Sequence, residues 1–256
     1  PPSLCEPWPP AAARAEAGRG SLLPNTTPMT CVDRHRMASR LDDVDDPVAT
    51  RYRTPMAAAT EPYLKTRRWR RAEYDRLVGL GIFAGERLEL LDGLLVVKEP
   101  QGSPHAAIVA HVGHVLSAAF GRRWHARLHS PLAIDDDSEP EPDVAMVTGE
   151  PRDYVGAHPS TAALVVEVAD SSLRLDRRLK AGLYARARLQ EYWIVNLVDG
   201  ALEVHREPER APDSAYGWVY GAAEILRPPG TVTPLAAPGA MILVADLLPV
   251  GGRAPA

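Results

Sequence analysis

Cysteine, long apolar runs and glycine-rich motifs are scarce in this sequence. Both cysteines, Cys5 and Cys31, precede residue 32, so the chain after them can form neither a disulfide framework nor a zinc–thiolate site. No run of about 18 apolar residues is present, as a membrane-spanning helix would require. The start also lacks the apolar core of a signal peptide. These absences predict a soluble, cytoplasmic protein.

Several enzyme motifs are absent as well. The sequence contains no glycine-rich phosphate loop, no nucleophilic serine elbow and no dinucleotide fingerprint, which excludes the enzyme classes that depend on them. The net charge of −4 gives no overall basic field that would attract nucleic acid, although a local cleft can still be positive. Hydrophobic residues make up 45% of the 256 residues, which is enough for one sizeable core.

Residues 1–62 differ in composition from the rest of the chain. They are rich in proline, alanine and arginine and show no sustained period of 2 or 3.6. Such a segment buries too little surface to offset the entropy lost on ordering. We therefore expect disorder in residues 1–62 and in the tail 251–256, with one domain at 63–250 between them. Met56 fits a native start, and the alternative is a regulatory arm whose charges nearly cancel.

From residue 69 onward, periodic patterns predict a series of helices and strands. A short helix at 70–82 stops at glycine, and Asp92-Gly93 is the pair that a tight hairpin turn prefers. Pro104 suits the first turn of the next helix. The expected elements are helix 104–124, strands 125–134, 144–147 and 161–170, helix 173–189, strands 191–198 and 201–207, and short strands within 216–227 and 231–247. This order predicts an α/β fold with a mixed sheet flanked by helices.

Glu167 is a carboxylate inside the continuous apolar stretch "LVVEVA". Burying an unpaired ionised carboxylate costs several kcal/mol, so a basic partner, a raised pKa or a metal ion has to compensate it. One interpretation is an ion pair with an arginine of the helix at 173–189. The other is a metal site.

A second carboxylate favours the metal site. In "SEPEPDVAMV", Asp143 stands directly before an apolar strand. Mg²⁺ binds one or two protein carboxylates and completes its octahedron with water and phosphate. Asp143 and Glu167, on neighbouring strands, could provide such a site. Lys180 follows on the next helix, nearly on the same face as Asp176 and Tyr184, where it could stabilise developing phosphorane charge or orient a water molecule.

These motifs resemble those of a known family. A proline–aspartate followed by an acid in a later strand, within an α-β-β-β-α-β order, is similar to the PD-(D/E)XK nuclease superfamily. More closely, "RLELLDG", "PQGSPHAAIV", "SEPEPDVAMV", "LVVEVADSSLRLDRRLKAGLYARARLQEYWIVN" and "LEVHR" resemble the Uma-type putative restriction endonuclease family of bacteria. The resemblance covers residues 67–249 and implies a restriction-endonuclease-like core, with an N-terminal hairpin and extra C-terminal strands.

The resemblance also implies the site residues. Asp143 and Glu167 correspond to ligands of Mg²⁺ or Mn²⁺, and Glu89 of "LELLDG" matches an additional acidic position. The usual place of the catalytic lysine is two residues after the acid, which here is Ala169. Catalysis would therefore depend on Lys180, which matches a catalytic lysine that has moved to the helix.

His105 matches a position that the family often fills with histidine, so it could contact a scissile phosphate. A helix cap or a surface residue is the alternative. The other histidines have no convincing ligand spacing and are interpreted as structural: His111, His114, His125 and His129.

We expect a metal-dependent endonuclease that hydrolyses DNA, with a homodimer left open. The alternative is a catalytically silent nuclease-fold module that binds nucleic acid or protein. Ala169, Asn196 in place of a frequent family aspartate, and the acidic net charge motivate that alternative.

Overall fold

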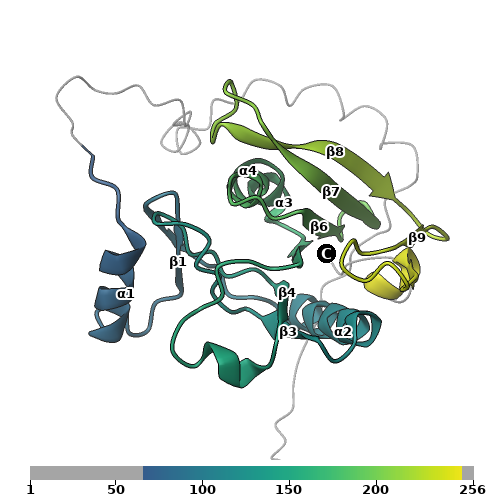
Figure 1. The fold of residues 1–256 in the computed structure, drawn as a ribbon, viewed down its shortest axis with the longest axis horizontal. Coiled ribbons are helices and arrows are strands. Elements are labelled where there is room, and N and C mark those ends of the chain that lie inside the picture. Colours follow the sequence, from purple (N-terminus) through teal and green to yellow (C-terminus); the bar gives the residue numbers. More distant parts are fainter. Residues whose placement is uncertain (1–65, 250–256) are drawn as a thin grey trace, which may run out of the picture. The chain divides into compact units, whose positions relative to one another are not determined.

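Six strands form one mixed sheet within residues 66–249, the part of the chain that this computed structural model describes (Figure 1). β5 and β6 are parallel, and every other neighbouring pair is antiparallel. In sheet order the strands are β3 (Trp124–Leu128), β4 (Val144–Thr148), β5 (Leu164–Ala169), β6 (Glu191–Asn196), β7 (Ala201–Arg210) and β8 (Trp218–Leu226). The predicted mixed α/β fold is confirmed. The predictions for residues 1–62 and 251–256 lie outside the described residues.

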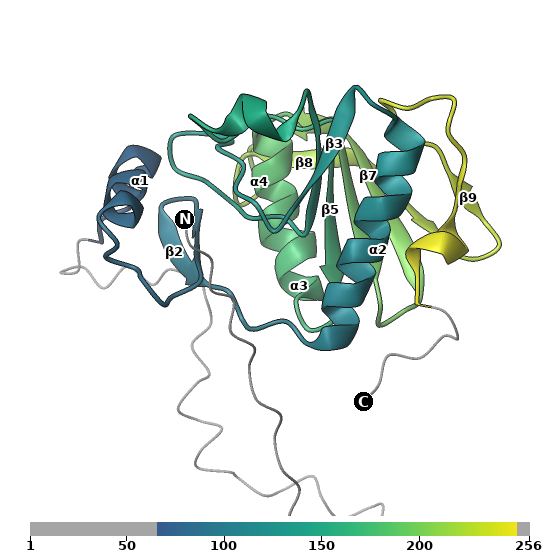
Figure 2. The same ribbon diagram turned by 90° about the horizontal axis from the view of Figure 1, so that it is seen from below.

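Helices cover both faces of this sheet (Figure 2). One face packs against α2 (Ser103–Phe120). The crossover from β5 to β6 covers the other face, because parallel strands need a long connection. This crossover consists of α3 (Leu173–Leu175), the π-helix η4 (Asp176–Lys180) and α4 (Ala181–Arg186).

Alternation along β5 decides which way each side chain points. Val166 and Val168 belong to the α2 side of the core, whereas Val165 and Ala169 pack on the α4 side. Because side chains alternate between faces, Glu167 shares the α4 side. All six residues of β5 are buried, as the continuous apolar run predicts.

The first described elements are not part of the large sheet, although Leu91 and Val96 pack against its α4 side. Helix α1 (Arg71–Gly79) precedes the hairpin of β1 (Leu88–Leu91) and β2 (Leu94–Val97), which forms a two-stranded sheet of its own. Asp92 and Gly93 have φ values of 49° and 77°, the positive values that the predicted tight turn needs.

The last described elements pack beside α2. They are β9 (Thr231–Val232), β10 (Ile242–Leu243) and the 3₁₀-helix η5 (Val244–Leu247); a further 3₁₀-helix, η3 (Pro151–Tyr154), follows β4. Val232, Ile242 and Val244 join the same core cluster as α2. Between residues 66 and 249, no helix is long and apolar enough to cross a membrane.

Several elements end at other residues than predicted: the helix expected at 104–124 ends at Phe120, and the strand expected at 201–207 continues to Arg210. The strand expected at 125–134 ends at Leu128, because His129 adopts a positive φ of 45° that a strand cannot continue through. Leu132 and Ile134 are nevertheless buried, which explains the strand-like pattern. The helix expected at 173–189 forms, but its middle turn is the π-helix η4, which side-chain periodicity did not reveal.

A buried ion pair joins β6 to β7. The Glu191 side chain is fully buried, and its Oε1 accepts hydrogen bonds from Arg206 Nε at 2.9 Å and Trp193 Nε1 at 3.0 Å. Its Oε2 accepts the backbone N–H of Leu235 at 2.8 Å. Removing one partner of a buried pair leaves an uncompensated charge.

We predict that Arg206→Gln lowers the free energy of unfolding by about 3 kcal/mol, since Glu191 stays buried without its cation. Urea unfolding of both proteins measures the difference. The matched control is Arg210→Gln on the same strand, because Arg210 lies over the Trp218 ring instead of a buried carboxylate. Equal losses in both variants would contradict the assigned role of the ion pair.

Candidate active site

A cavity of about 410 Å³ opens where β1, β5, η4 and the start of α2 meet. Its walls bring together all five site residues predicted from the sequence: Glu89, His105, Asp143, Glu167 and Lys180. Four of them come from different elements, and Asp143 directly precedes β4. The fold therefore places in one cavity residues that are up to 91 positions apart, from Glu89 to Lys180.

Glu167 is buried and is bound by side chains of the crossover helices. Its Oε1 accepts hydrogen bonds from Lys180 Nζ at 3.0 Å and from the Tyr184 hydroxyl at 2.8 Å. The predicted alternative, an ion pair with an arginine of this helix, is therefore wrong. Burial raises the pKa of Glu167 to about 8, although the Lys180 ammonium opposes this shift.

Asp143 lies beside Glu167. Its backbone N–H donates to Glu167 Oε2 at 3.4 Å, and its Oδ2 accepts the backbone N–H of Val168 at 2.8 Å. The ring nitrogens of His105 (Nε2) and His129 (Nδ1) each lie 3.3 Å from one Asp143 oxygen. Burial by itself would raise the pKa of Asp143, but these neighbours hold it well below its usual range. The two carboxylates thus have opposite pKa shifts, because burial dominates for Glu167 and the histidine and backbone contacts dominate for Asp143.

Lys180 reaches the site from the π-helix. Its ammonium, 3.0 Å from Glu167, also lies 3.5 Å from Glu89 Oε1, and the side chain is almost fully buried. Burial lowers the pKa of Lys180, but the carboxylates of Glu167, Glu89 and Asp176 outweigh this and raise it above the ordinary value. The ammonium therefore stays charged. Ala169, the residue at the usual lysine position, packs in the core on this side of the sheet.

Three further residues contact the site that the sequence analysis did not assign to it. Tyr184 donates to Glu167, Gln101 Nε2 donates to Asp143 Oδ1 at 3.0 Å, and His129 lies beside the same oxygen. The helical spacing of Tyr184 from Lys180 was a usable signal. Gln101 and His129 lie outside helices and strands, where no periodicity indicates direction, and His129 was interpreted as purely structural.

The other acids of "SEPEPDVAMV" have separate partners. Glu141 lies 3.5 Å from Lys98 Nζ, and its backbone N–H donates to Glu89 Oε2 at 3.0 Å. Glu139 is buried with Arg71 at 3.9 Å. Burial raises the pKa of Glu139 from its usual 4.5 to about 7, Asp75 adds to the shift, and Arg71 opposes it. Of the three acids, Asp143 alone adjoins Glu167.

The donor chemistry fits a hard divalent cation. Mg²⁺ needs only one or two protein carboxylates, because water and phosphate complete its octahedron, and carboxylates suit Mn²⁺ equally. Asp143 and Glu167 provide that pair in a cavity with room for water. Within residues 66–249, no group of three or more His, Cys, Asp or Glu side chains is arranged to hold a metal ion. An ion here would therefore depend on the carboxylate pair.

Comparison with known proteins adds a family. The family model described as "Uma2: Putative restriction endonuclease" matches residues 71–242. No curated protein matches the chain. Among solved structures, a crystal structure described as a putative nuclease belonging to DUF820 from Anabaena variabilis is similar, with 16% identity and a TM-score of 0.48. The match covers 63% of this chain and 89% of that one.

The raised pKa of Glu139 predicts a pH dependence of stability. Because its pKa is higher in the folded protein than in the unfolded chain, the folded state binds more protons between pH 4.5 and about 7. The free energy of unfolding therefore falls as pH rises through this window. We expect the free energy of unfolding to fall less between about pH 5 and pH 8 in Glu139→Gln than in the wild type, as measured by urea unfolding at both pH values.

The control for this comparison is Glu150→Gln, because the Glu150 side chain is exposed. That variant should follow the wild type at both pH values. Parallel pH profiles for the wild type and Glu139→Gln would contradict the prediction.

Proposed function

The chain belongs to the Uma2 family of putative restriction endonucleases, and from that membership we propose that it is a Mg²⁺- or Mn²⁺-dependent endonuclease that hydrolyses phosphodiester bonds of DNA. The observation that carries the proposal is the contact of Lys180 with Glu167 beside Asp143. Two carboxylates can hold a divalent ion for phosphodiester hydrolysis, and a lysine beside them can stabilise the charge that develops on the phosphoryl group. Here the lysine comes from a helix and not from the strand position occupied by Ala169.

The carboxylates would bind the cation. Asp143 and Glu167 are the residues that would hold it, and Glu89 would support them through Lys180. A bound divalent ion supplies polarisation of a phosphoryl oxygen and a lowered pKa for an attacking water. The low pKa of Asp143 suits this role, because the side chain is already ionised.

Lys180 acts as a donor in this mechanism. Its raised pKa keeps the ammonium protonated, so it does not serve as the base. It can instead donate a hydrogen bond to a phosphoryl oxygen on which charge develops, or orient the attacking water. His105 is less buried than Asp143 and lies at the start of α2, a position from which it could contact the scissile phosphate.

The charge of the cavity supports a role for the cation in a second way. Carboxylates outnumber ammonium groups in its walls: Glu89, Glu99, Asp143, Glu167, Asp170 and Asp176 face Lys98 and Lys180. A DNA phosphate entering this cavity would be repelled unless divalent cations offset the negative charge. Binding of the scissile phosphate should therefore depend on metal as strongly as its hydrolysis does.

We predict that the full chain cleaves plasmid or single-stranded DNA with Mg²⁺ or Mn²⁺ and not with EDTA. Asp143→Asn and Glu167→Gln should each lower the cleavage rate at least about 100-fold, because each removes an ion ligand. Lys180→Met should lower it by about 100-fold through the loss of one donor. Gel electrophoresis of the products over time measures these rates.

The matched control is Glu203→Gln. Glu203 is a similarly buried carboxylate on β7, but it pairs with Arg177 and is not part of the cavity wall. Its variant should cleave at the wild-type rate, with thermal unfolding monitored to verify folding. Absence of metal-dependent cleavage by the wild type, or undiminished cleavage by Asp143→Asn, would overturn the proposal.

A silent binding module is the second candidate, favoured by the surroundings of Asp143. Each of its two oxygens already lies within 3.3 Å of two nitrogen atoms, so an ion would have to displace at least one of them. This candidate predicts a DNA mobility shift without cleavage under any metal condition. The DNA partner and a homodimer both remain predictions.

A further inference from the structure

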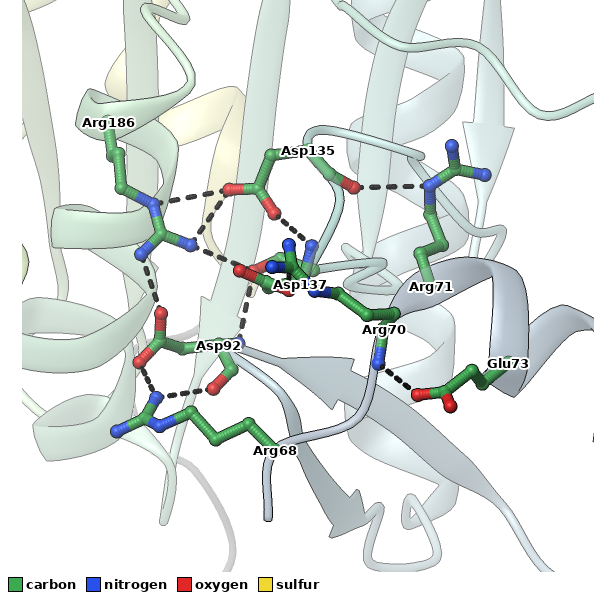
Figure 3. A network of polar contacts seen from close by, with 9 residues as sticks. Arg68, Arg70, Arg71, Glu73, Asp92, Asp135, Asp137 and Arg186 are labelled. Carbon is green, nitrogen blue, oxygen red and sulfur yellow. Dashed lines mark hydrogen bonds and ion pairs between the residues drawn. The ribbon is translucent and has the colours of Figure 1, made fainter.

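A network of arginines and aspartates joins α4 to the β1–β2 turn and to the loop at residues 135–138 (Figure 3). Arg186, the last residue of α4, is at its centre. Its Nη1 donates to Asp92 Oδ1 at 2.6 Å, and its Nη2 donates to Asp135 Oδ2 at 2.8 Å and to Ser138 Oγ at 3.1 Å. We call Arg186, Asp92, Asp135 and Ser138 the Arg186 clamp.

The clamp is more than a surface ion pair. Only a quarter of the Arg186 side chain is exposed, and Ser138 is fully buried. The Ser138 hydroxyl oxygen also accepts the backbone N–H of Asp92 at 3.0 Å. A guanidinium presents donors in a fixed planar fork, so it can bind two carboxylates and a hydroxyl together, whereas a lysine ammonium cannot reproduce that geometry.

Each segment that the clamp joins carries a residue of the candidate site. Asp92 is in the turn of the hairpin that begins with Glu89, and Arg186 ends the helix that Lys180 leads into. Asp135 and Ser138 belong to the loop that runs into Asp143. The clamp thus links the three segments at a distance from the cavity, since none of its members is in the cavity wall.

The contacts of the clamp add to the apolar packing of the hairpin, whose Leu91 is buried in the core on the α4 side of the sheet. In residues 66–249, β1 and β2 pair with each other and are not strands of the six-stranded sheet; one isolated bridge, Leu90 with Glu139, joins β1 to the loop. Outside that bridge, the Gly93 N–H donates to the Asp137 carbonyl at 2.7 Å. Glu89 in turn reaches Lys180 at 3.5 Å. A shift of the hairpin would therefore move Glu89 away from the lysine.

From these contacts we propose that Arg186 is a positioning residue of the nuclease site, an inference that rests on the proposed function. It holds the hairpin and the loop against α4, so that Glu89 stays beside Lys180. Arg186 itself touches no reacting atom. A displacement of about 1 Å in a catalytic group can cost about 100-fold in rate, so a distant clamp can control the reaction.

The test combines a structural and a kinetic measurement on the full chain. In Arg186→Gln, amide hydrogen exchange in peptides covering residues 88–97 should accelerate at least about tenfold, with β5 and β6 unchanged, because the hairpin opens locally. The kcat for metal-dependent DNA cleavage should fall about 10- to 100-fold, with KM changed less than about twofold. Arg186→Lys should rescue part of the loss, because an ammonium still pairs with one carboxylate.

A double-mutant cycle identifies the route of the effect. If Arg186 acts through Glu89, Arg186→Gln should lower kcat by less than about twofold further in a Glu89→Gln background. The control is Arg206→Gln, which removes another arginine from a buried carboxylate, Glu191, whose other partners are Trp193 and Leu235 and not the hairpin. The effect of Arg206→Gln on kcat, whatever its size, should be the same with Glu89 present and in the Glu89→Gln background.

Two outcomes would overturn the inference: unchanged exchange in residues 88–97, or an Arg186→Gln effect on kcat that is equally large with and without Glu89. If the wild type cleaves no DNA, the proposed function fails separately. Hydrogen exchange then tests separately whether Arg186 holds the hairpin in place. Faster exchange confined to the hairpin in Arg186→Gln would support this structural role, and unchanged exchange would contradict it.

Discussion

The buried ammonium of Lys180 is the interaction on which the candidate site depends. Three carboxylates surround it: Glu167, Glu89 and Asp176 raise its pKa, and it in turn lowers the cost of burying them. Moving an ion out of water costs several kcal/mol, so neither the acids nor the lysine would be stable in this cavity alone. This charge balance explains why the strand "LVVEVA" tolerates a carboxylate. It also explains how a lysine of the π-helix, and not residue 169, comes to lie beside Glu167.

Much of the fold could be predicted because it depends on patterns local in the sequence. Alternating and continuous apolar runs gave the order of helices and strands along the chain, and Asp92-Gly93 gave the hairpin turn. Glu167 stood out because a charge in an apolar strand has to be compensated. The π-helix, the strand end at His129 and the contact of Gln101 with Asp143 depend on backbone geometry and on contacts across the fold. The periodicity of apolar residues along the sequence cannot predict those features.

Charged side chains also hold together the segments that form the cavity. The cavity assembles from segments whose mutual position no shared sheet fixes, because the β1–β2 hairpin lies outside the six-stranded sheet. Apolar packing of Leu91 in the core and polar contacts of Glu89 and Asp92 hold the hairpin in place instead. Asp92 and Arg186 thus join segments of the cavity from positions outside its wall. A cation in the cavity would offset part of the negative carboxylate charge that the Lys180 ammonium now offsets.

The central claim is that Asp143 and Glu167 hold one divalent cation beside Lys180. Anomalous diffraction from a crystal grown with Mn²⁺ tests it most directly. The account predicts one strong peak about 2.1 Å from an oxygen of each carboxylate, with the Lys180 ammonium in the same cavity. An Mn²⁺ peak bound elsewhere, or no peak while Lys180 and Glu167 remain paired, would contradict the account.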